Sequence, residues 1–353
     1  MRVLLVMDPF IRVPPEQYGG IERVVADLGN GLARRGHEIT LWAAPGSQVD
    51  GRVETFGREG EWTRWSNLRN VLTLTTRFVR ATKRFDVIHN FGRLAYLTPV
   101  LARDVAKVQT YMRTVNPANM VTAQRLGARR LHYTAVSAAI RDTARGGGDW
   151  SVIYNCAVPS RYPFTGDTDA RTAPLVFLGR LDKIKGAHHA IAVARRLQRR
   201  LVIAGSISPY AHEQEYFERD IKPQIDGSLI SYIGPVDDRQ KRALLGGAAA
   251  MLMPIEWEEP FPVVLPEAML CGTPLIAFRR GGVPEGIEHG RTGFLCDTAD
   301  EMAALVARLP EIDRAVVRRE AERRFSDTAV VAEYERLYER LAHRIPLAAE
   351  SPA

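Results

Sequence analysis

The chain is short of cysteine and has no long apolar run. Its 353 residues include three cysteines, Cys156, Cys271 and Cys296, and their spacing does not suit a metal site. Structural disulfides are therefore not expected, and isolated thiols are typical of a reducing environment. The apolar run at residues 3–7 is too short for a signal peptide or a membrane span. We predict a buried strand there and a cytoplasmic protein.

Internal repeats and low-complexity tracts are absent, and so are two familiar ligand motifs. A dinucleotide oxidoreductase would need Gly-x-Gly-x-x-Gly directly after a strand, whereas Gly29-Asn30-Gly31 falls inside a predicted helix. The Asp-x-Asp letters of a metal motif occur at Asp167-Thr168-Asp169, within a linker that we predict to be a turn. The sequence thus predicts no metal site and no bound cofactor.

What the chain does contain is two rounds of alternating strand and helix patterns, which are typical of parallel α/β sheets. With 46% hydrophobic residues it is long enough for two domains. The first predicted helix, 21–35, ends at Gly36. Strands are predicted at 3–7, 37–43, 85–89, 106–111 and 133–136, and then at 175–178, 200–205, 229–234, 249–254, 274–278 and 293–295. A Pro-, Gly-, Asp- and Thr-rich segment, 159–174, predicts the boundary, with domains at 1–165 and 170–328.

Two glutamates, Glu259 and Glu267, form the most informative motif. Glu259 is predicted to lie in a loop, and Glu267 on the helix that follows it. A helix rises about 1.5 Å per residue, so the two carboxylates are separated along the helix axis. They could bind opposite ends of an elongated polar ligand, or simply be a solvated pair. Pro266 is tolerated only in a first helical turn, so we predict that this helix starts near Val263, with the amides of 261–264 facing the ligand.

A basic loop precedes this motif in the chain. Arg180 and Lys185 lie between a predicted strand, 175–178, and a predicted helix, 187–197. Helix N-termini favour anions, an Arg side chain offers a planar fork to phosphate oxygens, and Lys offers a point charge. The loop suits a diphosphate, although solvated surface cations are the ordinary alternative.

The motifs together resemble the retaining GT-B nucleotide-sugar glycosyltransferases of the glycogen synthase and mannosyltransferase kind (family-4-like). Further matching segments are Gly19-Gly20-Ile21-Glu22-Arg23, Gly272-Thr273-Pro274, Gly281-Gly282-Val283-Pro284-Glu285 and Gly290-Arg291-Thr292-Gly293-Phe294. The resemblance implies an α/β fold with two Rossmann-like domains that face each other across a deep cleft. It also implies that a final helix, 329–345, packs back on the N-terminal, acceptor-binding domain.

The resemblance further implies the roles of individual residues. The donor would be a nucleotide-diphosphate sugar, with UDP as the expected nucleotide, and the acceptor an unidentified small molecule, lipid or saccharide. The implied donor-binding residues are Gly19, Gly20, Gly179, Arg180, Lys185, Glu259, Phe261, Pro262, Val263, Val264 and Glu267. Catalysis would retain configuration by front-face attack and need no metal, because Arg180 and Lys185 stabilise the departing diphosphate.

The sequence departs from the family pattern near residue 112. Met112 occupies a position where many relatives have a histidine that contacts the transferred sugar. We expect Tyr111, Met112 and Arg113 to lie near the acceptor, and His89, predicted at a strand end, to share in catalysis with Arg180, Lys185 and Glu259. His188 and His189 open a predicted helix, but a metal site would need further ligands.

The formal net charge is +7, and the basic residues are concentrated between residues 62 and 145. Segment 66–85 is predicted to be a basic amphipathic helix, with Trp65 beside it. It can be a solvated face, a contact with an anionic membrane, or part of a site for an acidic acceptor. No motif indicates nucleic-acid binding.

Two alternative functions stay open at this point. One is a sugar-nucleotide epimerase of the same fold, whose motifs differ from the Glu259–Glu267 pair. The other is a protein with a decayed active site that only binds sugar nucleotides or membranes. The intact set of Arg180, Lys185, Glu259 and Glu267 argues against decay, while Met112 argues mildly for it.

Overall fold

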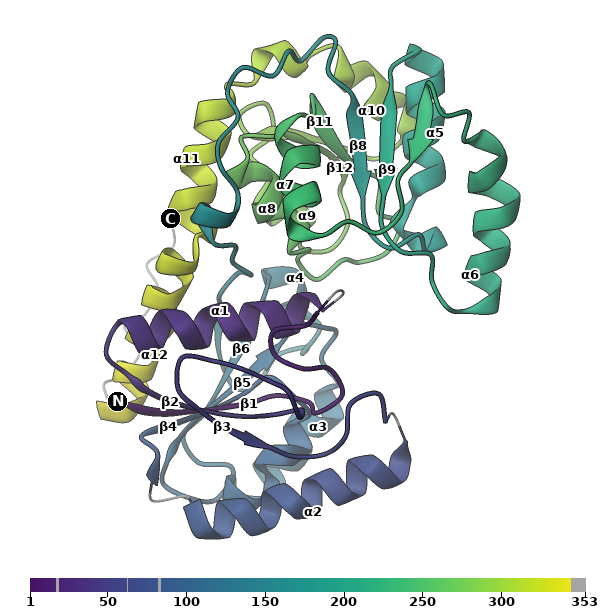
Figure 1. The fold of residues 1–353 in the computed structure, drawn as a ribbon. Helices are drawn as coiled ribbons and strands as arrows, with labels where there is room; N and C mark the ends of the chain where they lie inside the picture. Colours follow the sequence, from purple (N-terminus) through teal and green to yellow (C-terminus); the bar gives the residue numbers. More distant parts are fainter. Residues whose placement is uncertain (17–18, 62, 82–83, 344–353) are drawn as a thin grey trace. The chain divides into compact units, whose positions relative to one another are not determined.

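The computed structural model describes residues 1–16, 19–61, 63–81 and 84–343 (Figure 1). The chain forms two compact units. Unit 1 comprises Met1–Tyr154 together with the segment from Asp327 onward, and unit 2 comprises Asn155–Ser326. Each unit is built on its own parallel sheet.

Unit 1 has a seven-stranded sheet in the order β3-β2-β1-β4-β5-β6-β7, and every neighbouring pair is parallel. Its strands are β1 (Arg2–Val6), β2 (Glu38–Ala43), β3 (Arg52–Thr55), β4 (Val87–Asn90), β5 (Ala106–Tyr111), β6 (Leu131–Ala135) and β7 (Asp149–Val152). Its α-helices are α1 (Gly20–Arg34), α2 (Arg64–Ala81), α3 (Pro117–Arg125), α4 (Ala138–Asp142) and α12 (Asp327–His343).

The core of unit 1 follows from its apolar pattern. Val3, Leu4, Leu5 and Val6 are fully buried, as expected for a central parallel strand covered on both faces. Strands β3 and β7 were not predicted from the sequence. Both are edge strands whose residues are largely exposed or half-buried, so they lack an apolar run.

Helix α12 packs beside α1 on one side of this sheet, while α2 and α3 lie on the other side (Figure 1). The packing is close at Gly31, where a Cβ atom would lie 2.5 Å from Val331 Cγ2. At its start, the Asp327 carboxylate accepts a 2.8 Å hydrogen bond from Arg34. The predicted helix 329–345 thus begins two residues earlier, and residues 344 and 345 lie outside the described residues.

Unit 2 has a six-stranded parallel sheet in the order β10-β9-β8-β11-β12-β13. Its strands are β8 (Leu175–Leu178), β9 (Leu201–Ala204), β10 (Ile230–Tyr232), β11 (Ala250–Met253), β12 (Leu275–Phe278) and β13 (Gly293–Cys296). Its α-helices are α5 (Ala187–Leu197), α6 (Ala211–Tyr216), α7 (Asp238–Gly246), α8 (Val264–Leu270), α9 (Val283–Gly286), α10 (Ala299–Val306) and α11 (Arg314–Phe325).

The change of unit falls at residues 154 and 155, which is earlier than the predicted boundary at 165–170. The segment after Tyr154 is irregular, as its composition predicts, but it packs on unit 2. Ala157 N–H donates to Phe325 O at 2.9 Å, and Thr165 N–H donates to Cys271 O at 3.1 Å. Composition marked the irregular segment correctly, but it could not show which unit this segment contacts.

Loops at the carboxyl ends of β8 and β11 approach each other closely in unit 2. Gly186, the N-cap of α5, has a φ of 77° in the left-handed region, and a Cβ there would lie 1.9 Å from Pro254 O. A side chain at this position would push the two loops apart.

Among the described residues, no helix is long and apolar enough to cross a membrane.

Replacing Gly186 by alanine should therefore destabilise unit 2. The left-handed conformation costs a side-chain-bearing residue about 1–2 kcal/mol, and the contact with Pro254 O adds to that cost. Gly234 is the matched control because its φ is 76° but no atom lies within 4 Å of its Cβ position. In urea unfolding, Gly186→Ala should lose clearly more stability than Gly234→Ala. Equal losses would show that the close approach is unimportant.

Candidate active site

The basic loop between β8 and α5 carries three cations and one buried carboxylate. Arg180 Nε donates to Asp182 Oδ2 at 2.5 Å, and Asp182 is only 3% exposed. The chain then forms a short 3-10 turn, Lys183–Lys185, whose first amide donates to Glu213 Oε2 at 2.7 Å. These contacts fix the backbone of the loop and leave the Arg180 side chain 32% exposed.

Lys185 meets the first glutamate of the predicted pair. Its Nζ lies 2.5 Å from Glu259 Oε2, and the Trp257 indole N–H donates to the same oxygen at 2.8 Å. Lys185 Nζ also lies 5.4 Å from the centre of the Trp257 ring. Two donors and an aromatic wall therefore fix the Glu259 carboxylate, which is largely buried.

The Gly281-Gly282 motif supports the backbone that holds Glu259. Gly282 N–H donates to Glu259 O at 2.7 Å, and Gly281 N–H donates to the Glu258 side chain at 2.6 Å. Gly281 has a φ of 56°, and a Cβ there would lie 2.2 Å from Glu259 O. The glycine is thus needed for the close contact between the loop after β12 and the loop after β11.

Glu267, the second glutamate, lies in the first turn of α8 and is 4% exposed. Its Oε1 accepts a 2.6 Å hydrogen bond from the Tyr162 hydroxyl and lies 2.6 Å from Lys241 Nζ. Lys241 comes from α7 and also lies 5.5 Å from the centre of the Tyr162 ring. Neither Tyr162 nor Lys241 was predicted to belong to the site, because neither belongs to a recognisable motif.

Three carboxylates of the site each pair with one cation. Arg180 pairs with Asp182, Lys185 with Glu259, and Lys241 with Glu267. Buried carboxylates without partners are costly, so each of these pairs offsets the charge of a buried carboxylate. A ligand that carries phosphates and hydroxyls can bind by exchanging partners, with its phosphates on the cations and its hydroxyls on the carboxylates.

Helix α8 starts at Val264 with Val263 as its N-cap, which confirms the start predicted from Pro266. The Phe261 and Pro262 side chains are buried, whereas Val263 and Val264 are half-buried. Phe261 packs against Phe325 with ring centres 5.4 Å apart, and its carbonyl accepts a 2.7 Å hydrogen bond from Asn155. The Phe261 side chain therefore holds the segment in place from inside unit 2.

Within unit 2 the structure brings together several of the residues that the sequence singles out. Lys185 contacts Glu259, Arg180 shares the loop of Lys185, and Gly179 begins that loop. Gly19 and Gly20 belong to unit 1, at the start of α1. A Cβ at Gly19 would lie 2.8 Å from Glu22 Oε2, so this glycine allows the Glu22 side chain to fold against the start of the helix.

The predicted catalytic role of His89 is not supported, because the residue lies in the core of unit 1. It is fully buried within β4. Its Nδ1 lies 2.5 Å from the Tyr338 hydroxyl and its Nε2 lies 2.5 Å from Thr110 Oγ1. Burial lowers the pKa of His89 well below its usual range. The sequence showed a histidine near a strand end but not the helix, α12, that covers it.

The proposed acceptor residues follow one another at the end of β5. Tyr111 and Met112 are half-buried, and Arg113 is exposed. Tyr111 packs beside the stacked rings of Tyr133 and Trp150, whose centres lie 6.1 and 5.8 Å from its own. Its hydroxyl is buried, has no hydrogen-bond partner among the described residues, and its pKa is raised by that burial.

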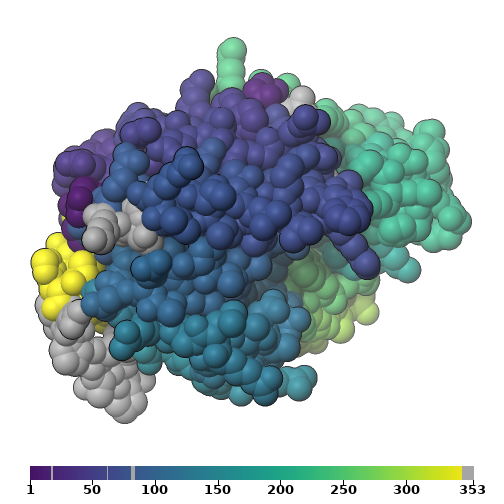
Figure 2. Space-filling view, turned by 90° about the horizontal axis from the view of Figure 1, so that it is seen from below, coloured from purple at the N-terminus to yellow at the C-terminus, as the bar shows by residue number. Residues whose placement is uncertain are grey.

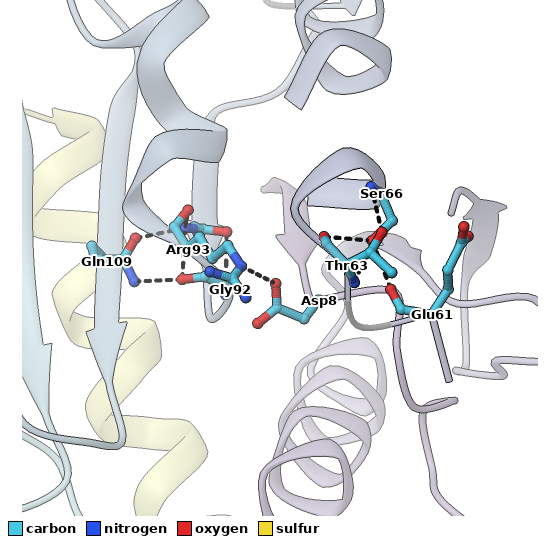
Figure 3. Close-up of polar contacts among 8 residues, drawn as sticks. Asp8, Glu61, Thr63, Ser66, Gly92, Arg93 and Gln109 are labelled. Atoms are coloured by element: carbon cyan, nitrogen blue, oxygen red, sulfur yellow. Dashed lines mark hydrogen bonds and ion pairs between the residues drawn. The ribbon is translucent and has the colours of Figure 1, made fainter. Parts of the chain in front are cut away.

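A charged cluster at the strand ends of unit 1 was missed by the sequence analysis. Asp8 follows β1, and its buried Oδ1 lies 3.9 Å from Arg93 Nε (Figure 3). Burial raises the pKa of Asp8, and burial also raises the pKa of Glu22 on α1. Arg113 opposes both shifts by its charge. The position of Asp8 directly after a buried strand was the available signal.

Family models cover most of the chain. A model described as "Glycosyl transferases group 1" matches residues 165–329, and one described as "Glycosyltransferase Family 4" matches residues 18–161. A glycogen synthase of Mycobacterium tuberculosis is 28% identical over 376 aligned positions, which cover 91% of this chain and 88% of that enzyme.

Solved structures agree with these matches. AviGT4, a glycosyltransferase involved in avilamycin A biosynthesis, is 31% identical, with a TM-score of 0.70 over 97% of this chain and 98% of that one. HepE from Anabaena, solved with UDP and glucose, has a TM-score of 0.72 at 20% identity over 96% and 99% of the two chains.

Two Rossmann-like units, each built on its own parallel sheet, together with these matches define a GT-B glycosyltransferase. The chain belongs to the family-4 type of these transferases. The epimerase and decayed-site alternatives are not favoured by these matches.

The buried state of His89 predicts a specific pH dependence of stability. Its pKa is lower in the folded than in the unfolded protein, where it is near 6.5, so stability is lost as the pH falls below about 6.5. Between pH 7 and pH 5 the unfolding free energy of the wild type should fall by about 2 kcal/mol more than that of His89→Gln. Chemical unfolding at both pH values measures this difference.

The exposed His212 provides the control for that experiment, since its side chain is 75% accessible. His212→Gln should keep the pH dependence of the wild type. A His89→Gln variant with the same pH dependence as the wild type would show that His89 is not held neutral in the folded protein.

Proposed function

We propose that the chain is a retaining glycosyltransferase that moves a sugar from a UDP-sugar to an acceptor hydroxyl without a required metal ion. The observation that carries the proposal is the set of three ion pairs at the strand ends of unit 2. UDP is supported by HepE, a structural relative solved with UDP and with UDP-glucose. Another relative, a starch synthase solved with ADP, makes ADP the competing base.

In this mechanism Arg180 and Lys185 bind the diphosphate. Their positive charges stabilise the negative charge that develops on the leaving group when the bond to the sugar breaks. The leaving phosphate accepts the proton of the attacking hydroxyl on the same face of the sugar, so the configuration is retained. The two side chains supply the charge stabilisation that a divalent cation would provide in other transferases.

Donor binding exchanges partners within the ion pairs. Lys185 turns from Glu259 to the diphosphate, and Glu259 then accepts hydrogen bonds from the sugar hydroxyls. Glu267 accepts the ribose hydroxyls while Lys241 and Tyr162 keep its carboxylate in place. Each group that leaves one partner gains another, so the exchange leaves no buried charge unpaired.

The acceptor is proposed to bind at unit 1. Asp8, Arg93 and Arg113 lie at the carboxyl ends of its parallel strands, where ligands bind in such sheets. Two carboxyl groups with raised pKa values, Asp8 and Glu22, are typical of a functional site rather than of a solvated surface. The cluster suits an acceptor that has hydroxyls and a negative charge.

A thermal-shift panel of UDP, GDP, ADP and dTDP tests the donor site. We expect UDP to raise the melting temperature, since a ligand at about a hundred times its Kd adds about 2.7 kcal/mol of stability. Glu267→Ala should lose this shift. With UDP-sugar as donor, Arg180→Ala and Lys185→Ala should each lower kcat by about 10²–10³-fold if they act as transition-state donors.

The control variant is Glu215→Ala, since that side chain is 73% accessible on α6. It should keep both the UDP shift and the transfer rate. A shift with ADP alone would change the proposed base, and active Arg180→Ala and Lys185→Ala variants would contradict the proposed mechanism.

We also propose that α2 contacts an anionic membrane surface. The helix buries Ser66, Asn70, Leu74 and Phe78 against unit 1. Its opposite side exposes large apolar side chains, namely Trp65 (81%), Leu68 (52%), Leu72 (58%) and Val79 (69%). Exposed arginines on the same helix are Arg64, Arg69 and Arg80. Figure 2 shows the side of unit 1 to which α2 contributes, with α2 in blue-violet.

An exposed apolar stripe flanked by arginines is typical of a helix that lies in a membrane interface. Cosedimentation with phosphatidylglycerol vesicles tests this. Trp65→Ser/Leu68→Ser/Leu72→Ser should weaken binding about tenfold or more, since burying one such side chain contributes about 1.5–3 kcal/mol. Val121→Ser/Leu126→Ser removes exposed apolar side chains elsewhere and should bind like the wild type. Equal loss in both variants would contradict a specific α2 contact.

A further inference from the structure

Three potential metal ligands converge in unit 2 outside the donor-binding contacts described above. His188 and His189 open α5, and Glu256 lies in the loop after β11. One ligand atom from each lies within 4.8 Å of the other two. Among the residues that the structure describes, this is the one group of three or more His, Cys, Asp or Glu side chains whose ligand atoms lie this close together. The two histidines are adjacent in the sequence, and the fold brings the Glu256 carboxylate to them.

The distances suit a small tetrahedral cation. His189 Nε2 lies 2.9 Å and His188 Nε2 lies 3.7 Å from Glu256 Oε1. Zinc bonds to nitrogen and oxygen of about 2.0–2.1 Å place tetrahedral ligands about 3.3 Å apart, between these two separations. The side chains of His189, His188 and Glu256 are 28%, 29% and 37% accessible, so they are not packed on all sides and can rotate.

Neighbouring groups prepare His188 for this role. Its Nδ1 lies 2.8 Å from the Tyr216 hydroxyl, and that contact leaves Nε2 directed at Glu256. A hydrogen bond to the outer nitrogen is the usual way in which a metal-binding histidine is oriented. Tyr216 and His188 both line a cavity of about 480 Å³.

We propose that His188, His189 and Glu256 bind one Zn²⁺ ion through two imidazole nitrogens and a carboxylate oxygen. Two histidines with one carboxylate are a ligand set that Zn²⁺ accepts, and the fourth position is left to water. The site is separate from donor chemistry, because none of its three ligands belongs to the ion pairs formed by Arg180, Lys185 and Lys241.

Bound zinc would join two segments of the donor half. Glu256 N–H already donates to Ile184 O at 2.9 Å, so the loop after β11 contacts the turn Lys183–Lys185. Glu256 also lies three positions before Glu259 in the chain. An ion held by α5 and this loop therefore stabilises the backbone beside the Lys185–Glu259 contact, and we expect it to raise the melting temperature of the protein.

Isothermal titration with Zn²⁺ on metal-free, untagged protein tests the proposal. The wild type should bind one equivalent, and Co²⁺ in its place should give the visible absorption of a tetrahedral site. His189→Ala and Glu256→Ala should each weaken zinc binding at least about tenfold. Tyr216→Phe removes only an orienting contact, so it should weaken zinc binding by no more than these two variants do. His212→Ala is the control and should bind like the wild type.

The proposal is overturned if the wild type binds no zinc, or if His189→Ala and Glu256→Ala keep the wild-type affinity. Binding that is lost in the control His212→Ala would also overturn it, because the ion would then bind elsewhere. Circular dichroism of each variant shows whether it is folded. A loss of binding counts in favour of the site when it occurs in variants with the wild-type spectrum.

Discussion

The close backbone contact between three loops of unit 2 is the constraint on which the candidate site depends. Gly186 approaches Pro254 O, and Gly281 approaches Glu259 O, each in a left-handed conformation that leaves no room for a side chain. Because these loops follow neighbouring parallel strands, their contact brings Lys185 to Glu259. The Lys185–Glu259 ion pair cannot bring the loops together by itself, because the pair forms only when the loop backbones are already close.

Charge balance is the second constraint, and it links stability to ligand binding. Glu259 and Glu267 are almost fully buried, yet both must be accessible to a sugar nucleotide in the proposed function. Lysines and a tyrosine hydroxyl keep the carboxylates paired before the donor binds. A donor with phosphates and hydroxyls offers new partners to the lysines and to the carboxylates. This favours such a donor over a ligand that has only phosphates or only hydroxyls.

The predicted strands and helices agree best with the structure where burial imposes a pattern. The central strands β1 and β8 and the helix α5 correspond closely to apolar runs, whereas β3 and β7, at the sheet edge, have no such run. The predicted boundary at 165–170 differs from the change of unit at residues 154 and 155 for another reason. Composition reveals that a segment is irregular, but only its hydrogen bonds show that it packs on unit 2.

The sequence by itself determined the fold class and the family-4 type of transferase, because the glycine and charged motifs that define them are local. It also placed Arg180, Lys185, Glu259 and Glu267 on the loops and helix where the structure has them. Only the tertiary structure decided their partners, since Lys241, Tyr162 and Asp182 reach them through space. For the same reason, only the tertiary structure shows that His89 is buried under α12 and that Glu256 lies beside the two histidines of α5.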